Sequence, residues 1–375
     1  MRGYRILAIL ILLSATVVLT GAGRNPEGNA AVNYVDERNE LVSLVFRLAG
    51  SRAYSEVTTE YQRSLNSAFN EFNGHPVIQY VHDLWAQEFW IGFDAVFAMA
   101  IHLEKAGDEF ILLDNIDLLV EETAGMVRWT RENAPEFVRL LNDFYTDINF
   151  SEFFQRNTPY YLEQSARFAD ELYNNVNLAW FGQFGKNPDN MRVILSPSTS
   201  QNAYGRSVYC ADTGDSIIYA GLFIADNYSR WHNFVAHEFA HSFSNPMAEV
   251  WYAENEEFRR LVDDTFLNSR RLSSSYSIEM IVAYEYLTRA HTILYMMENT
   301  NANLWRLLFE EKYLWGFPNI EKVYAMITNH TPMLHILVPL IIIILVLLII
   351  VLPVFLIVRR LKRRKTRKMN MQASQ

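Results

Sequence analysis

The stretch that decides the fold is WHNFVAHEFAHSFSNPMAE, residues 231 to 249, in which two histidines stand four residues apart. On a helix, residues i and i+4 share a face, so His237 and His241 can direct ring nitrogens at one cation. Glu238 would lie beside that cation, where it can accept a proton from bound water. The spacing therefore predicts one zinc ion. The alternative is that these are two ordinary surface or core histidines.

The segments before this stretch predict the surroundings of its helix. Residues 33 to 181 repeat apolar side chains at three- and four-residue steps, which predicts mostly helices, with Gly50 and Gly107 as stops. The residues from His237 to His241 form the pattern HExxH. The helix that carries it, the HExxH helix, is predicted to end near Asn245 and Pro246, because proline cannot continue a helix. Strands of a small sheet are predicted from three short β-branched runs, MRVILSP (191–197), GRSVYCA (205–211) and DSIIYAGLFIA (215–225). The fold class is therefore α+β and predominantly helical.

A catalytic zinc ion keeps three protein ligands and one open position, so a third ligand is required. The metzincin pattern fails, because Ser244 and Met247 occupy the positions where it needs a glycine and a third histidine. The remaining candidates are His291 and carboxylates further along the chain.

The segment SIEMIVAYEYLTRAHTILYMM, residues 277 to 297, predicts a helix that is apolar on almost every side and therefore buried. It contains Glu279 and Glu285, and a buried carboxylate needs a cation or hydrogen-bond donors. A metal ion would satisfy either one. For Glu285 the alternative is a structural ion pair with Arg289, one helical turn along.

Two segments resemble a known family. HEFAHSFSNP and EYLTRA are similar to the HEFxHxFxNP and ExxxRA signatures of an uncharacterised bacterial family, a domain of unknown function regarded as gluzincin-like metallopeptidases. The resemblance covers most of residues 34 to 310. It implies a zincin-like fold, with the small sheet before the HExxH helix, and it favours Glu285 over Glu279 as the third zinc ligand.

The two ends of the chain carry targeting signals. Residues 1 to 23 have the order of a signal peptide, a basic start, a short apolar region and small residues, although an uncleaved anchor is the alternative. Residues 333 to 358 contain no charged side chain, which predicts one transmembrane helix. The basic run after it, within 359 to 375, predicts a cytoplasmic tail that can contact anionic lipid. Residues 24 to 332 are then a single extracytoplasmic metallopeptidase domain of a cell-membrane protein.

Charge and cysteine content narrow the partners. All 42 acidic residues but only 23 of the 33 basic residues lie between positions 24 and 332, so this segment has a net charge of −19. Such an acidic domain repels the phosphate backbone, which argues against a nucleic-acid partner. Cys210 is the single cysteine, so no internal disulfide can form.

Together these features predict a membrane-anchored zinc metallopeptidase that hydrolyses peptide or protein substrates, with Glu238 as general base. Two alternatives remain: a cell-surface binding or sensor protein with a non-catalytic zinc site, and a zinc hydrolase acting on another bond. An extended substrate could add as a strand to residues 201–209 or 215–223. The residue that stabilises the oxyanion is left open among Tyr204, Tyr276, Tyr284, Arg289 and His291.

Overall fold

The computed structural model describes most of the chain between residues 34 and 328. The described ranges are 34–57, 59–122, 125–200, 202–210, 214–224, 232–269 and 278–328. Within them the protein is mostly helical, with two small β-sheets.

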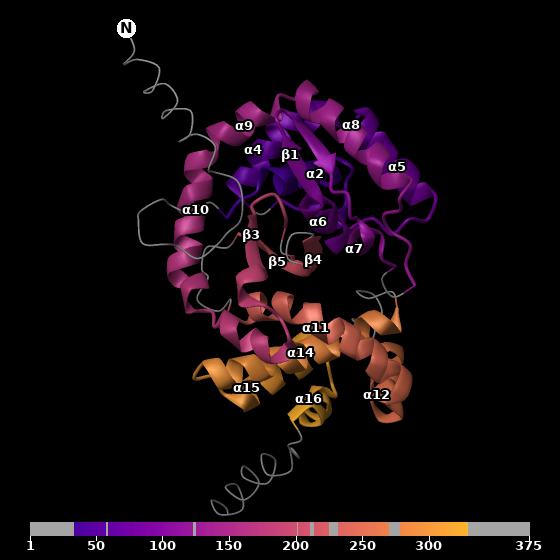
Figure 1. Ribbon diagram of the computed structural model, residues 1–375, viewed down its shortest axis with the longest axis vertical. Coiled ribbons are helices and arrows are strands. Elements are labelled where there is room, and N and C mark those ends of the chain that lie inside the picture. The colour runs from indigo at the N-terminus through magenta and orange to yellow at the C-terminus, as the bar shows by residue number, and fades with distance from the viewer. Residues whose placement is uncertain are drawn as a thin grey trace, which may run out of the picture.

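The first half of the described chain forms a helical layer above the larger sheet (Figure 1). Two of its helices begin at side-chain caps: the Asp36 side chain accepts from the Arg38 backbone N–H at the start of α2, and Thr59 and Gln62 form a capping box at the start of α4. The helices are α2 (Glu37–Leu48), α3 (Arg52–Ser55), α4 (Glu60–Phe69), α5 (Pro76–Ala86), α6 (Asp94–Ile101), α7 (Asp117–Val120), α8 (Asn133–Asp147), α9 (Phe150–Arg156) and α10 (Thr158–Glu171).

One part of this layer differs from the prediction. The segment before Gly107 is not the end of a helix, because it forms an antiparallel hairpin of β1 (Leu103–Ala106) and β2 (Glu109–Leu112). Gly107 lies in the hairpin turn with a φ of +68°, a conformation that glycine adopts without strain. Gly50, by contrast, follows the end of α2 as predicted.

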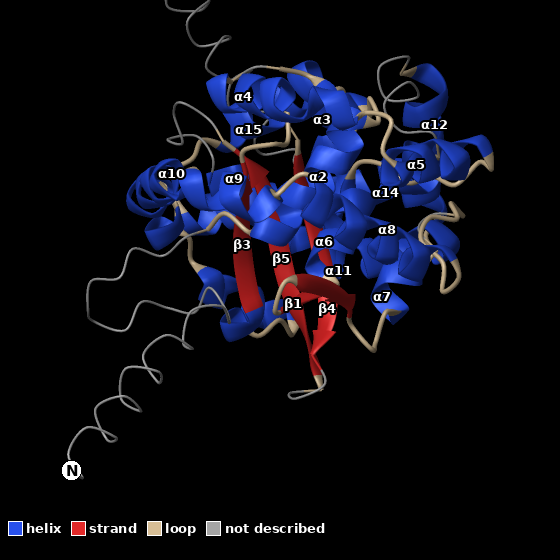
Figure 2. Ribbon diagram, turned by 90° about the horizontal axis from the view of Figure 1, so that it is seen from above, coloured by secondary structure: helices blue, strands red, loops and turns tan. Residues whose placement is uncertain are grey.

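The larger sheet contains the three predicted strands in the order β3 (Met191–Ser196), β5 (Asp215–Phe223), β4 (Ala203–Cys210). β3 runs parallel to β5 and β4 runs antiparallel to it, and Figure 2 shows the three side by side within the helical body. Helices cover both faces. A Cβ on Gly221 would lie 2.7 Å from the Phe97 ring on α6, whereas one on Gly205 would lie 2.1 Å from the Glu238 carbonyl oxygen.

The helices that follow the larger sheet in the chain lie on the opposite face of the sheet from α6 (Figure 1). α14 packs along α11. The buried side chains of α11 belong to both main hydrophobic clusters, one around the sheet and one around α12, α14 and α16. These elements are α11 (His232–Glu254), α12 (Glu256–Asn268), α14 (Glu279–Asn299), α15 (Leu304–Phe309), a π-helical turn (Glu310–Trp315) and α16 (Ile320–Thr328).

The predicted end of the HExxH helix at Pro246 is wrong, because α11 continues through this proline to Glu254. A proline removes one backbone donor from the helix and costs stability. The residues after it compensate, since Ala248 is fully buried and Met247 and Trp251 pack in the cluster around α14.

The predicted fold class also included a transmembrane helix, which the described helices do not support. None of the described helices combines the length and the apolar content needed to cross a bilayer. The longest two, α11 and α14, have 23 and 21 residues, but both carry several charged side chains. Residues 333–358, to which the transmembrane helix was assigned, lie outside the described ranges, as do the predicted signal peptide at 1–23 and the basic tail at 359–375.

Candidate metal centre

His237 and His241 lie one turn apart on α11, as their spacing predicts. Their ring centroids are 4.8 Å apart and the ring planes are nearly perpendicular, at 89°. Both side chains are mostly buried, with exposed fractions of 14% and 15%. Burial, and then the nearby His241 and Arg289, hold the pKa of His237 well below its usual value. His237 is therefore a neutral imidazole at pH 7, the form that binds metals.

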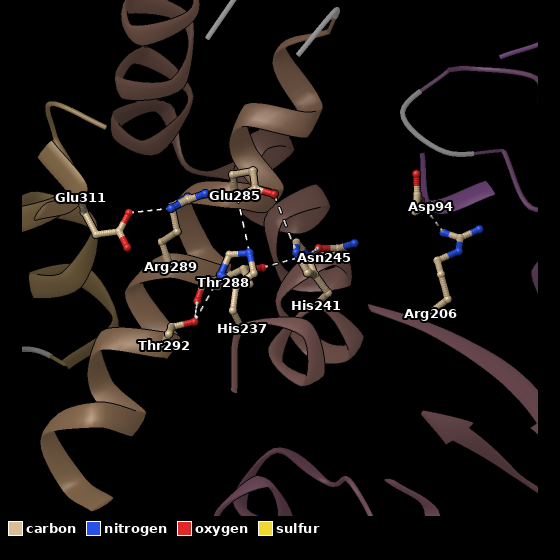
Figure 3. A network of polar contacts seen from close by, with 10 residues as sticks. All are labelled: Asp94, Arg206, His237, His241, Asn245, Glu285, Thr288, Arg289, Thr292 and Glu311. Atoms are coloured by element: carbon tan, nitrogen blue, oxygen red, sulfur yellow. Dashed lines mark hydrogen bonds and ion pairs between the residues drawn. The ribbon is translucent and has the colours of Figure 1, made fainter. Parts of the chain in front are cut away.

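Glu285 reaches this pair from α14 (Figure 3). Its Oε2 atom lies 3.6 Å from Nε2 of His237, and its Oε1 atom lies 3.7 Å from Nε2 of His241. One ligand atom from each of the three residues lies within 4.8 Å of the others. A tetrahedral zinc ion with bonds of about 2.0–2.1 Å separates its ligand atoms by about 3.4 Å, so the three groups need little movement. These three residues could hold a metal ion.

Hydrogen bonds on the far side of each imidazole orient its Nε2 atom toward Glu285. Nδ1 of His241 lies 2.9 Å from Oδ1 of Asn245, which can only accept, and 3.2 Å from the Thr288 hydroxyl, so both contacts suit a protonated Nδ1. Thr292 gives its single hydroxyl proton to the Thr288 carbonyl at 2.8 Å, so it accepts from Nδ1 of His237 at 3.4 Å. In the tautomer with the proton on Nδ1, both Nε2 atoms have free lone pairs, as ligating histidines require.

Glu238 is buried between α11 and β4, with 5% of its surface exposed. Its backbone carbonyl lies so close to Gly205 that a side chain at position 205 would clash with it. Burial, and then the negative charge of Glu285, raise the pKa of Glu238 well above its usual value. A carboxylate with a raised pKa binds a proton more readily, which suits a general base.

A second charged group lies on the β4 side of the centre. Asp94 pairs with Arg128 at 2.7 Å and with Arg206 of β4 at 3.6 Å. Although burial acts to raise the pKa of Asp94, the two guanidinium groups hold it below its usual value. The resulting negative charge contributes to the raised pKa of Glu238.

The ion pair between Glu285 and Arg289 is also present. Glu285 therefore lies beside the two histidines, as a metal ligand would, and also pairs with Arg289. Nε of Arg289 lies 3.0 Å from Oε2 of Glu285, and Nη1 of Arg289 lies 2.7 Å from Oε2 of Glu311. Glu285 therefore contacts the histidines on one side and the guanidinium on the other (Figure 3).

The other candidates for ligand lie elsewhere. Glu279 is the first residue of α14 and does not belong to the cluster. Burial, and to a smaller extent the charge of Glu279, raise the pKa of Tyr252. His291 is buried on another side of α14, where Nδ1 lies 2.8 Å from the Leu287 carbonyl and 3.1 Å from the Ser244 hydroxyl. Burial lowers its pKa to about 4.

The residues predicted as oxyanion candidates lie in different surroundings. Tyr284 donates to Glu249 at 2.5 Å, and the ring of Tyr204 stacks on Tyr54 at 6.3 Å between centroids. His291 contacts the Leu287 carbonyl and the Ser244 hydroxyl, and Arg289 is paired with two carboxylates. Tyr276 lies outside the described ranges.

Several parts of the centre were not predicted from the sequence, including Thr292, Asp94, Asn245 and Glu311. Asn245 was assigned to a helix end, although its position four residues after His241 is the signal for a hydrogen bond on the same helix face. Glu311 follows Glu285 at a long sequence separation, and no local pattern links the two.

A comparison with protein families identifies the family of this chain. The family described as Domain of unknown function (DUF4932) matches residues 30–329. The chain belongs to this family. The predicted likeness to a domain of unknown function is thereby confirmed, whereas the kinship with gluzincin-like metallopeptidases has no support from the DUF4932 description. The chain matches no curated protein and no solved structure.

Proposed function

We propose that this protein is a zinc metallopeptidase that uses His237, His241 and Glu285 as metal ligands and Glu238 as general base. The observation that carries the proposal is the convergence of the three ligand atoms within 4.8 Å, from two helices, beside a buried carboxylate. Two histidines and one carboxylate are the ligand set of the thermolysin type of catalytic zinc site. A structural zinc site normally has four protein ligands and needs no base.

The chain's own residues supply the remaining chemistry. Zinc bound in this centre would lower the pKa of a water molecule from about 16 to about 7 and polarise a peptide carbonyl. Glu238 accepts the proton of the attacking water and passes it to the leaving amine, a role worth roughly 10²–10⁴-fold in rate. Asn245 and Thr292 hold the two imidazoles in the tautomer that leaves Nε2 free.

The sheet topology favours one of the two predicted substrate strands. β5 is the central strand and pairs on both sides, so residues 215–223 have no free edge. β4 pairs only with β5 among the described strands, and its Gly205 lies against the base Glu238. We therefore place an extended peptide along β4, where its backbone can form ladder hydrogen bonds.

The full-length protein should cleave peptides only when it holds zinc. A mixed peptide library is incubated with the protein as purified, with the protein after 1,10-phenanthroline, and with the stripped protein after zinc is restored, and products are identified by mass spectrometry. We expect cleavage in the first and third samples and none in the second, because the chelator removes the ion that activates water.

Two results would contradict this proposal. Cleavage that survives complete removal of the metal would exclude a zinc mechanism. Zinc-loaded protein that cleaves no peptide would exclude a peptidase, and hydrolysis of esters or other amides by the same sample would then favour the alternative hydrolase. Zinc binding without hydrolysis of any bond would favour the binding or sensor protein.

A further inference from the structure

Among the described residues, four side chains surround Arg289 behind the metal centre. Its guanidinium pairs with Glu285 at 3.0 Å and Glu311 at 2.7 Å, and it lies 4.5 Å from the ring centroid of Phe317 and 5.5 Å from that of Trp315. The three charged side chains are between 12% and 15% exposed. Carboxylates and aromatic faces both attract a guanidinium, so this enclosure fixes the position of Arg289.

A π-helical turn builds half of this enclosure. Residues Glu310–Trp315 are wound more widely than an α-helix, and the backbone N–H of Phe317 donates to the Glu311 carbonyl at 3.0 Å. The turn brings Glu311 and Trp315 to the same guanidinium, whereas the adjacent Glu310 pairs with Arg306 at 2.8 Å. Such π-helical turns are rare and are frequent at functional sites.

The enclosure constrains the two oxygen atoms of Glu285 differently. Oε2 accepts the hydrogen bond from Nε of Arg289, while Oε1 receives none from any residue that the structure describes. A carboxylate without such a partner can rotate and offer a metal both oxygens. A carboxylate held at one oxygen offers the metal only the other oxygen. A zinc ion bound in this way keeps its fourth position open for water, as a catalytic site requires.

We propose that Glu311 is a positioning residue of the metal centre, which holds Arg289 so that Glu285 binds the metal through one oxygen. This inference rests on the proposed metal site but not on peptide hydrolysis. Outer hydrogen-bond partners of metal ligands typically contribute roughly 10- to 100-fold in metal affinity. Glu311 acts through Arg289 and does not touch the metal or the substrate.

The test uses the full chain with cobalt(II), whose visible spectrum reports coordination number. Metal-free parental protein, Glu311→Gln and the matched control Glu310→Gln are titrated with cobalt in competition with a chelator. Glu310→Gln removes the adjacent ion pair to Arg306 and leaves Arg289 untouched. We expect Glu311→Gln to lose roughly 10- to 100-fold in cobalt affinity. Its absorption bands should weaken toward those of five-coordinate cobalt, while Glu310→Gln matches the parent in both measurements.

A purely structural role for Glu311 predicts a different outcome. The melting temperature of the metal-free Glu311→Gln protein would fall, but cobalt affinity and spectrum would equal those of the parent, and this result would overturn the inference. Arg289→Lys tests the same link if Glu311→Gln fails to fold, because lysine keeps the charge but cannot bridge two carboxylates in the same geometry. Parental cobalt binding in Arg289→Lys would likewise contradict it. A parent that binds cobalt but cleaves no peptide would contradict only the proposed function.

Discussion

Glu238→Gln is expected to reduce peptide hydrolysis by roughly 10²–10⁴-fold while the zinc content stays near one ion per chain. The substitution keeps the size of the side chain and removes the proton acceptor. Glu238 is buried directly after the ligand His237, so its carboxylate is the acidic group of α11 next to the metal ligands. The comparison of kcat for parent and variant, with zinc measured on the same samples, checks this expectation.

The matched control for Glu238 is Glu254→Gln, which changes an exposed glutamate at the end of the same helix. It should leave both activity and zinc content at the parental level. Loss of zinc together with activity in Glu238→Gln would show that Glu238 is a ligand. Parental activity in Glu238→Gln would show that another group accepts the proton.

Glu285→Ala is expected to lower zinc affinity by more than the roughly 10- to 100-fold that is typical of outer partners, because it removes a ligand. The matched control is Glu279→Ala on the same helix, which removes a carboxylate that lies outside the cluster. Zinc affinity is measured by chelator competition on both variants. Loss of affinity in Glu279→Ala beside parental affinity in Glu285→Ala would reverse the assignment of the third ligand.

The stability of the same two variants separates the ligand role of Glu285 from its ion pair. Removing one partner of a buried ion pair typically costs about 3–5 kcal/mol, because the other charge is left alone. In Glu285→Ala, Arg289 keeps its 2.7 Å pair with Glu311, so we expect a smaller loss. Denaturant unfolding of the metal-free proteins gives this difference without any contribution from zinc.

The parts of the centre that could be predicted from the sequence are those set by local geometry. The four-residue spacing fixes how His237 and His241 share one face of α11, and the apolar pattern around Glu285 predicts a buried helix. The choice of Glu285 over Glu279 depended on the family signature, because both are carboxylates on one apolar helix. The distances now distinguish them, since only Glu285 lies beside the two histidines.

The remaining parts depend on contacts between distant segments. Glu311 reaches Arg289 only because the chain returns through a π-helical turn, which no periodicity in the sequence indicates. The passage of α11 through Pro246 depends on burial of Ala248 in a cluster built from later helices. The need for glycine at position 205 comes from the approach of β4 to the Glu238 carbonyl, which is visible only after the strand and the helix have been placed.

The most direct test of the central claim is the zinc content of the purified full-length protein, measured by elemental analysis after dialysis. The parent is expected to retain one zinc ion per chain, and the double variant His237→Ala, His241→Ala is expected to retain none, because it keeps one of the three ligands. A parent without zinc after incubation with the metal, or a double variant that retains one ion per chain, would contradict the assignment of this centre.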